Sequence, residues 1–84
     1  MRVGVLLFAS LKEELGPRVE VDVPPGADGV VRVAALRGAL AAAHPAFARL
    51  GRRALVAVGE SYAADSDAIG ERDEVAILPP VAGG

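Results

Sequence analysis

Only one segment of this chain has both the length and the periodicity of a main helix, and this restricts the fold more than any other feature. Between about Val30 and Ala43, apolar residues recur at spacings of three and four, at Val33, Leu36, Leu40 and Ala43. Asp28 is the expected N-cap of this helix, and Pro45 is expected to end it. One helix with one apolar face must bury that face against another layer, so the rest of the chain must supply a sheet.

Residues rich in β-formers precede and follow this helix. Arg2 to Ala9 is a continuous apolar run, typical of a central strand that is buried on both faces. Residues 19–23 alternate between Val and acidic residues, as in a half-exposed strand. Residues 54–58 and 74–78 are further strand candidates, and Tyr62 is expected in a short edge strand. The sequence therefore predicts a sheet built from both ends of the chain.

A short helical segment is expected directly after the first strand. Ser10 and Glu13 have the spacing of a capping box for a helix over Leu11 to Leu15, which Gly16 and Pro17 then stop. The resulting order of elements matches an α+β fold in which one main helix covers one face of a mixed sheet. The expected core residues are Val5, Leu7, Val33, Leu36, Leu40, Val56, Val58, Val75 and Ile77.

Length and composition exclude several classes of function. With 84 residues, the chain is expected to form one domain, residues 1–84, and it is too short for a large multi-domain enzyme. It contains no Cys, which excludes disulfide scaffolds, zinc fingers, iron–sulfur clusters and thiol catalysis. The net charge of −2 argues against a nucleic-acid partner. No apolar run reaches the roughly 18 residues of a membrane span, so we expect no membrane partner and a cytoplasmic location.

Charge is distributed unevenly along the chain. Acidic residues outnumber basic ones in residues 60–84, which suggests a partner with a basic face. The arginines in residues 49–53 form a basic cluster, which we interpret as a solvated loop.

The chain lacks the residue sets of a catalytic or metal site. His44 is the only histidine, so a paired-His metal site cannot form, and its place at the end of the main helix, directly before Pro45, favours a structural role over a catalytic one. Asp65 and Asp67 match positions of a calcium loop, but Ile69 and Ala76 stand where oxygen ligands belong. No glycine-rich phosphate loop lies between a strand and a helix. We therefore expect no bound metal or cofactor, and any ATP must be bound by a partner.

The C-terminus is the segment whose chemistry stands out. Pro79 and Pro80 cannot donate hydrogen bonds to a sheet, so we expect them to end the last strand and launch a flexible tail over about residues 80–84. Gly83 and Gly84 lack Cβ atoms, so we expect this segment to be narrow enough to enter a narrow cleft. A free carboxylate is a poor electrophile, so the Gly84 carboxyl would need activation, for example as an acyl-adenylate, before it accepts sulfur or an amine. The chain is expected to be a carrier rather than an enzyme.

Three segments, in the same order as in a known family, carry a resemblance. They are residues 5–16 (VLLFASLKEELG), residues 55–62 (LVAVGESY) and residues 73–84 (DEVAILPPVAGG). Together they resemble the small subunit of molybdopterin synthase, the MoaD family. The resemblance implies a ubiquitin-like β-grasp fold and a sulfur carrier. The chain departs from the family's usual residues at three turn positions, Gly59, Ala68 and Arg72.

The resemblance also implies roles for particular residues. Gly84 would be adenylated by an E1-like, MoeB-like adenylyltransferase that uses ATP, and would then become a thiocarboxylate. Inserted into a MoaE-like large subunit of molybdopterin synthase, it would donate sulfur to the pterin precursor in molybdenum cofactor biosynthesis. The inserted tail would comprise Val81, Ala82 and Gly83. The partner-facing surface would include Lys12, Tyr62 and Leu78.

Two other functions stay open on the sequence. The first is a carrier or protein modifier for another route, such as thiamine synthesis, tRNA thiolation or protein conjugation, because related proteins in those routes also end in Gly-Gly. The second is a non-covalent β-grasp interaction module whose tail is chemically inert.

Overall fold

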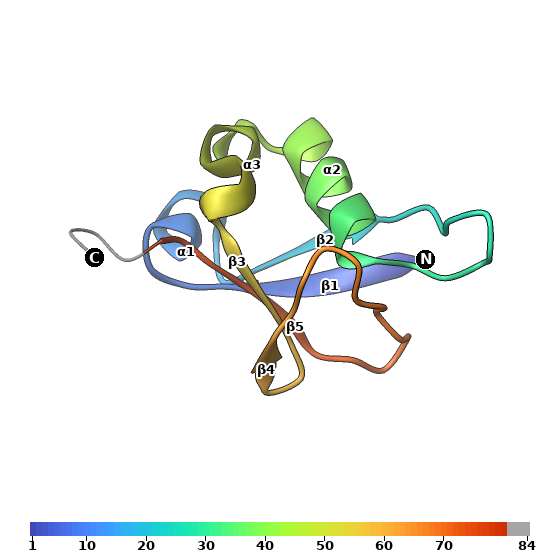
Figure 1. The fold of residues 1–84 in the computed structure, drawn as a ribbon. Coiled ribbons are helices and arrows are strands. Elements are labelled where there is room, and N and C mark those ends of the chain that lie inside the picture. Colours follow the sequence, from blue (N-terminus) through green and yellow to red (C-terminus); the bar gives the residue numbers. More distant parts are fainter. Residues whose placement is uncertain (81–84) are drawn as a thin grey trace.

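The first and last strands of the chain lie side by side within a five-stranded mixed sheet (Figure 1). The computed structural model describes residues 1–80. In chain order the elements are β1 (Arg2–Leu7), α1 (Ala9–Leu15), β2 (Arg18–Asp22), α2 (Val33–Ala43), α3 (Pro45–Leu50), the 3-10 turn η1 (Gly51–Arg53), β3 (Leu55–Val58), β4 (Ser61–Tyr62) and β5 (Val75–Leu78). The strand order is β2-β1-β5-β3-β4. The β1–β5 pair is parallel, and the other neighbouring pairs are antiparallel.

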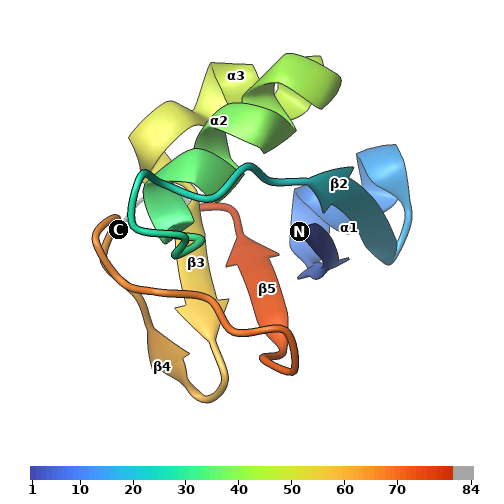
Figure 2. The same ribbon diagram turned by 90° about the vertical axis from the view of Figure 1, so that its right-hand side faces the viewer.

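The core lies between the sheet and the helices α2 and α3, which cover the same face of the sheet in Figures 1 and 2. All the predicted core residues are buried except Val58, which is half-buried. The apolar face of α2 contributes Val33, Leu36 and Leu40, whereas Ala43 is exposed in the last turn. The predicted main helix packed on a mixed sheet is therefore confirmed. None of the helices within residues 1–80 is long and apolar enough to cross a membrane.

The helix α2 starts later than predicted, and Asp28 is not its N-cap. Arg32 occupies the cap position without a side-chain hydrogen bond to the helix. Asp28 instead closes a turn, accepting hydrogen bonds from the Arg32 guanidinium (2.8 and 3.1 Å) and from the Val30 amide (3.1 Å). The Arg32 guanidinium, with the Val30 amide, lowers the pKa of Asp28 from 3.8 to about 2. This carboxylate therefore favours the folded turn at neutral pH, and the contribution is lost as the pH falls toward 2.

Backbone carbonyls from the loop before β5 cap α2 in place of a side chain. The amides of Val33 and Ala34 donate to the carbonyl oxygens of Asp67 (3.0 Å) and Asp65 (2.9 Å). The first amides of a helix have no partner within the helix, so these bonds satisfy groups that would otherwise be buried without one. Contacts across more than 30 residues of sequence thus set where α2 begins, which explains why the local cap prediction failed.

The predicted capping box at Ser10 is also wrong. The helix α1 begins at Ala9, with Phe8 in the cap position and no side-chain cap. Phe8 remains extended after β1 ends (φ −132°, ψ 160°), and Ser10 therefore lies inside the first turn rather than ahead of it. Gly16 ends α1 as predicted, and its amide donates to the carbonyl oxygen of Lys12.

The arginines interpreted as a solvated basic loop are exposed, as predicted, but they lie in the last turn of α3 and in η1 rather than in a loop. Pro45 ends α2 but also opens α3, where its missing amide would have had no partner anyway. Phe47 is buried, and its ring packs edge-on against His44 with centroids 5.9 Å apart. At the surface, the Arg49 guanidinium donates to the Glu14 carboxylate of α1 at 3.1 Å. The apolar residues Ala46, Phe47 and Leu50 have the spacing of one helical face, and this spacing could have predicted α3.

The structure shows a conformation or a contact for two of the three residues that depart from the family's usual turn residues. Gly59 begins the turn between β3 and β4 with φ of +65°, a left-handed conformation that glycine adopts without strain. Ala68 forms an isolated antiparallel bridge with Arg32, just ahead of α2. Nothing in the structure explains Arg72.

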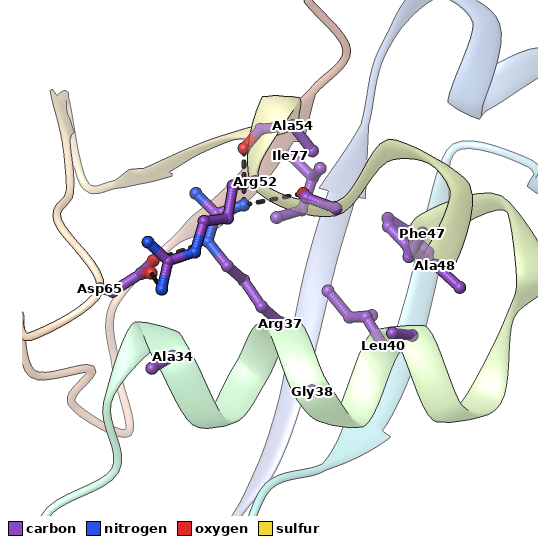
Figure 3. A pocket seen from close by; sticks show the side chains of 12 residues that line it. Ala34, Arg37, Gly38, Leu40, Phe47, Ala48, Arg52, Ala54, Asp65 and Ile77 are labelled. Carbon is purple, nitrogen blue, oxygen red and sulfur yellow. Dashed lines mark hydrogen bonds and ion pairs between the residues drawn. The ribbon is translucent and has the colours of Figure 1, made fainter.

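Arg37 links α2 to two segments distant in sequence. Its Nε donates to Asp65 Oδ1 at 2.7 Å, and its Nη1 donates to the carbonyl oxygen of Ala54 at 2.7 Å (Figure 3). The side chain is only 20% exposed, so water screens these bonds less than those of a surface pair. Arg37 therefore holds the loop that caps α2 against the start of β3.

We expect Arg37→Met to lower the free energy of unfolding by about 1–2 kcal/mol, because the Asp65 carboxylate and the Ala54 carbonyl lose their shared donor. Arg52→Met is the matched control, since Arg52 is 91% exposed and lies 3.9 Å from the same carboxylate. It should change stability by less than about 0.5 kcal/mol. Urea denaturation of both variants measures the difference, and equal losses would contradict the assigned role.

Adjacent residues of β5 face opposite sides of the sheet and provide a second test. Ile77 is buried beneath the helices, whereas Leu78 is half-buried on the other face. Ile77→Ala should cost about 2–5 kcal/mol of stability by leaving a cavity. Leu78→Ala should cost about 1 kcal/mol, because less apolar area leaves contact with the protein. Thermal or urea melts that rank Leu78→Ala as the more damaging change would contradict this assignment of faces.

Candidate functional site

The face of the sheet opposite α2 and α3 carries large apolar side chains that are accessible to solvent. Tyr62 is 70% exposed, Phe8 is 45% exposed and Leu55 is 39% exposed. Leu6 and Leu78 are half-buried on the same face. We call these five residues, Leu6, Phe8, Leu55, Tyr62 and Leu78, the open-face patch. A group of this kind on a small domain is typical of an interaction surface.

Strand register brings the patch together. Leu55 lies directly opposite Leu78 in the antiparallel β3–β5 pair. Two residues back along β5, the register aligns Leu6, Ala76, Ala57 and Tyr62 in one row across β1, β5, β3 and β4. The two alanines in the middle are shorter than Leu6 and Tyr62, so the large side chains of this row stand at its two ends.

The parallel β1–β5 pair places the end of β5 beside the patch. Because the two strands run in the same direction, Leu78 leaves the sheet at the end where β1 gives way to Phe8 and α1 (Figure 1). Lys12, in α1, is exposed at that same end of the molecule. Tyr62 shares the face but lies in the outermost strand, with β3 between it and Leu78. The structure thus groups Lys12 and Leu78 at the chain's exit point and sets Tyr62 further across the sheet.

Three patch residues were missed by the sequence analysis, and two of them, Leu6 and Phe8, come from the first apolar run. Phe8 was assigned to the buried first strand, although β1 buries only alternate residues and Phe8 falls on the open side. The alternation of β1 was the signal that could have found it. Leu55 enters the patch through its register with Leu78, which no local pattern encodes.

The other half of the open face is charged. The Arg2 guanidinium pairs with the carboxylates of Glu20 (3.7 Å) and Asp22 (3.3 Å) on β2. The Arg18 guanidinium lies over Gly4 of β1, in the space that a Cβ at this glycine would occupy. A hollow there is lined partly by the acidic residues 71, 73 and 74. The open face therefore changes from apolar at the exit of β5 to charged at its opposite end.

Within residues 1–80, no group of three or more His, Asp or Glu side chains is arranged to hold a metal ion. The two acidic residues that partly matched a calcium loop have other partners. Asp65 pairs with Arg37, and the Asp67 carboxylate accepts a hydrogen bond from the Ala64 amide at 2.8 Å. The predicted reacting residue Gly84, and the predicted inserted residues Val81, Ala82 and Gly83, lie outside the described residues.

Comparison with known proteins places the chain in a family. The ThiS family model matches residues 5–84. The molybdopterin synthase sulfur carrier subunit of Mycobacterium tuberculosis is 36% identical over 86 residues, which cover 100% of this chain and 99% of that protein. The protein of the same name from Arabidopsis thaliana is 31% identical, with coverage of 100% and 84%.

Solved structures agree on the fold. The crystal structure of SAMP1 from Haloferax volcanii superposes with a TM-score of 0.76, at 34% identity and with full coverage of both chains. A structure of small archaeal modifier protein 1 from H. volcanii gives a TM-score of 0.68, covering 95% of this chain and 98% of that one. The predicted ubiquitin-like β-grasp fold is confirmed. Because the family match spans nearly the whole chain and full-length relatives exceed 30% identity, the chain belongs to the ThiS family, alongside the molybdopterin synthase sulfur carrier subunits.

Proposed function

We propose that this protein is the sulfur carrier subunit of a molybdopterin synthase and that the carboxyl group of Gly84 carries the sulfur. The observation that carries the proposal is the position of the end of β5, which leaves the middle of the sheet beside an exposed apolar patch. The names of the full-length relatives support the same function. The chain has no Cys that could carry sulfur on a side chain, which leaves the terminal carboxyl as the chemically reasonable carrier.

The proposed chemistry requires activation by another protein. The Gly84 carboxylate attacks the α-phosphorus of ATP and releases pyrophosphate, which gives an acyl-adenylate. A sulfur nucleophile at the oxidation level of hydrosulfide then displaces AMP and leaves a thiocarboxylate. In the large subunit its sulfur would bond to the pterin precursor, and water would cleave the acyl carbon–sulfur bond and restore the Gly84 carboxylate. Terminal glycines suit this path because they carry no Cβ that could block a narrow active site. ATP and its site belong to an E1-like activating enzyme, so this chain acts as a substrate and carrier without catalysing a step.

The open-face patch is the proposed docking surface for the large subunit. Tyr62 and Leu78 supply apolar contact area, and Lys12 provides a cation at the edge nearest the exit of β5. Phe8 and Leu55 extend the same surface. Exposed aromatic and aliphatic residues at the centre of a patch commonly supply most of the binding energy of an interface. Docking on this face would position the chain's C-terminal residues toward the partner.

A second function uses the same carboxyl. The likeness to an archaeal protein named as a modifier favours a role in which an amine, rather than a sulfur nucleophile, attacks the activated Gly84. Carriers for thiamine synthesis or tRNA thiolation also share this activation step. A non-covalent interaction module with an inert tail differs from these alternatives, because it would need no activation of the Gly84 carboxyl.

Removing Gly84 tests the proposed carboxyl. The new terminus at Gly83 withdraws the reacting carbon by about 3.5 Å, whereas reacting atoms must come within about 3–3.5 Å of each other. We expect ATP–pyrophosphate exchange with the cognate activating enzyme to be lost, and lost also when one residue is added after Gly84. Circular dichroism and thermal melting control for folding. Undiminished exchange by both variants would refute the carrier function and favour the inert-tail module.

Leu78→Asp tests the proposed docking surface. A charge in the patch must be desolvated on binding, so we expect affinity for the large subunit to fall about tenfold or more. Ala42→Asp is the matched control, because it places the same charge on an exposed position of α2 on the opposite side of the sheet. Calorimetry should show unchanged affinity for this control. Equal binding of wild type and Leu78→Asp would place the interface elsewhere.

A further inference from the structure

A cavity lies on the helical side of the molecule, in the layer opposite the open-face patch. Its volume is about 310 Å³, and α2, α3 and η1 surround it (Figure 3). Leu40, Phe47 and Ile77 form its floor, where only 1–5% of each residue is exposed. Its accessible apolar lining comes from small residues, including Gly38, Ala41 and Ala48, which leave it open to solvent on one side. At about 30 Å³ for each water-sized group, the cavity has room for about ten non-hydrogen atoms. This size is at the lower end of the range for small-molecule sites.

One end of the cavity is polar and carries a net positive charge. Figure 3 shows the side chains of Arg37 and Arg52 converging on the single carboxylate of Asp65. Arg37 Nε holds that carboxylate at 2.7 Å, a hydrogen-bond distance. Arg52 Nη2 lies 3.9 Å from its other oxygen, which is too long for a hydrogen bond. Two guanidinium groups therefore share one carboxylate.

Arg52 is the group available to a ligand. Its side chain is 91% exposed, so turning its guanidinium toward a bound anion would break only a weak contact. Arg37 must stay in place, because it also donates to the carbonyl oxygen of Ala54. Arginine presents its donors in a planar fork that matches a carboxylate, and the pairing is stronger beside an apolar surface than in open water.

We propose that this cavity binds a small monocarboxylate of about ten non-hydrogen atoms. Its apolar end would lie over the floor of the cavity and contact Gly38, Ala41 and Ala48, and its carboxylate would pair with the Arg52 guanidinium at the mouth. A cationic ligand would be repelled by the two guanidinium groups, and a neutral one would gain no ion pair. Because the cavity and the open-face patch lie in opposite layers, the site does not depend on the function proposed for Gly84.

A matched pair of probes tests both the size and the charge. 3-Phenylpropanoate has an aromatic end and one carboxylate, and 3-phenylpropanamide has the same shape without the charge. In a titration of the full chain followed by amide NMR, we expect the acid to shift the signals of Gly38, Ala48 and Gly51 in a saturable way. The dissociation constant should lie below about 10 mM, within reach of a ligand of this size. The amide should bind at least about tenfold more weakly.

Two charge reversals complete the test. Arg52→Glu should weaken binding of the acid by about tenfold or more, because it replaces the pairing cation with an anion. Arg72→Glu makes the same change in net charge at an exposed residue that does not line the cavity, and it should leave the affinity unchanged. The proposal is overturned by equal affinities for acid and amide, by equal effects of the two charge reversals, or by the absence of a saturable response to the acid below about 10 mM.

Discussion

The parallel pairing of β1 with β5 is the constraint on which the rest of the fold depends. It joins the two ends of the chain in the interior of the sheet, with Val5 opposite Val75 and Leu7 opposite Ile77. A parallel pair requires a long crossover between its two strands. The chain between β1 and β5 includes α2, α3 and the β3–β4 hairpin. The same pairing determines where β5 leaves the sheet, so one backbone interaction sets both the core and the point at which the last strand ends.

The two faces of the sheet have different chemical characters, and this difference separates folding from binding. Toward the helices, buried Val, Leu and Ile residues form a core with no buried polar or charged side chain among the described residues. Away from the helices, the open-face patch exposes Phe8, Leu55 and Tyr62, whose burial folding does not require. Residues next to each other in one strand, such as Ile77 and Leu78, therefore serve stability and the proposed docking separately. This arrangement lets a small domain keep an exposed apolar surface without weakening its core.

The sequence predicts the elements whose patterns are local and misses those that depend on distant contacts. The spacing of Leu36 and Leu40 identifies α2, and the alternation in residues 19–23 identifies β2, because burial imposes those periods directly. Asp28 failed as a cap because carbonyls of residues 65 and 67 satisfy the first amides of α2. Leu55 was missed for a similar reason, since only its register with Leu78 places it in the patch. The chemistry of a side chain indicates which hydrogen-bond or packing contacts it can make, but the tertiary structure determines which of them it does make.

Transfer of sulfur through the carboxyl of Gly84 is tested most directly by intact mass spectrometry of the protein purified from its native cells. We predict a species heavier than the unmodified chain by the difference between one sulfur and one oxygen atom, with the change located in the C-terminal fragment. The species should be present in cells that are making molybdenum cofactor. Detection of only the unmodified chain under those conditions would contradict the proposed function.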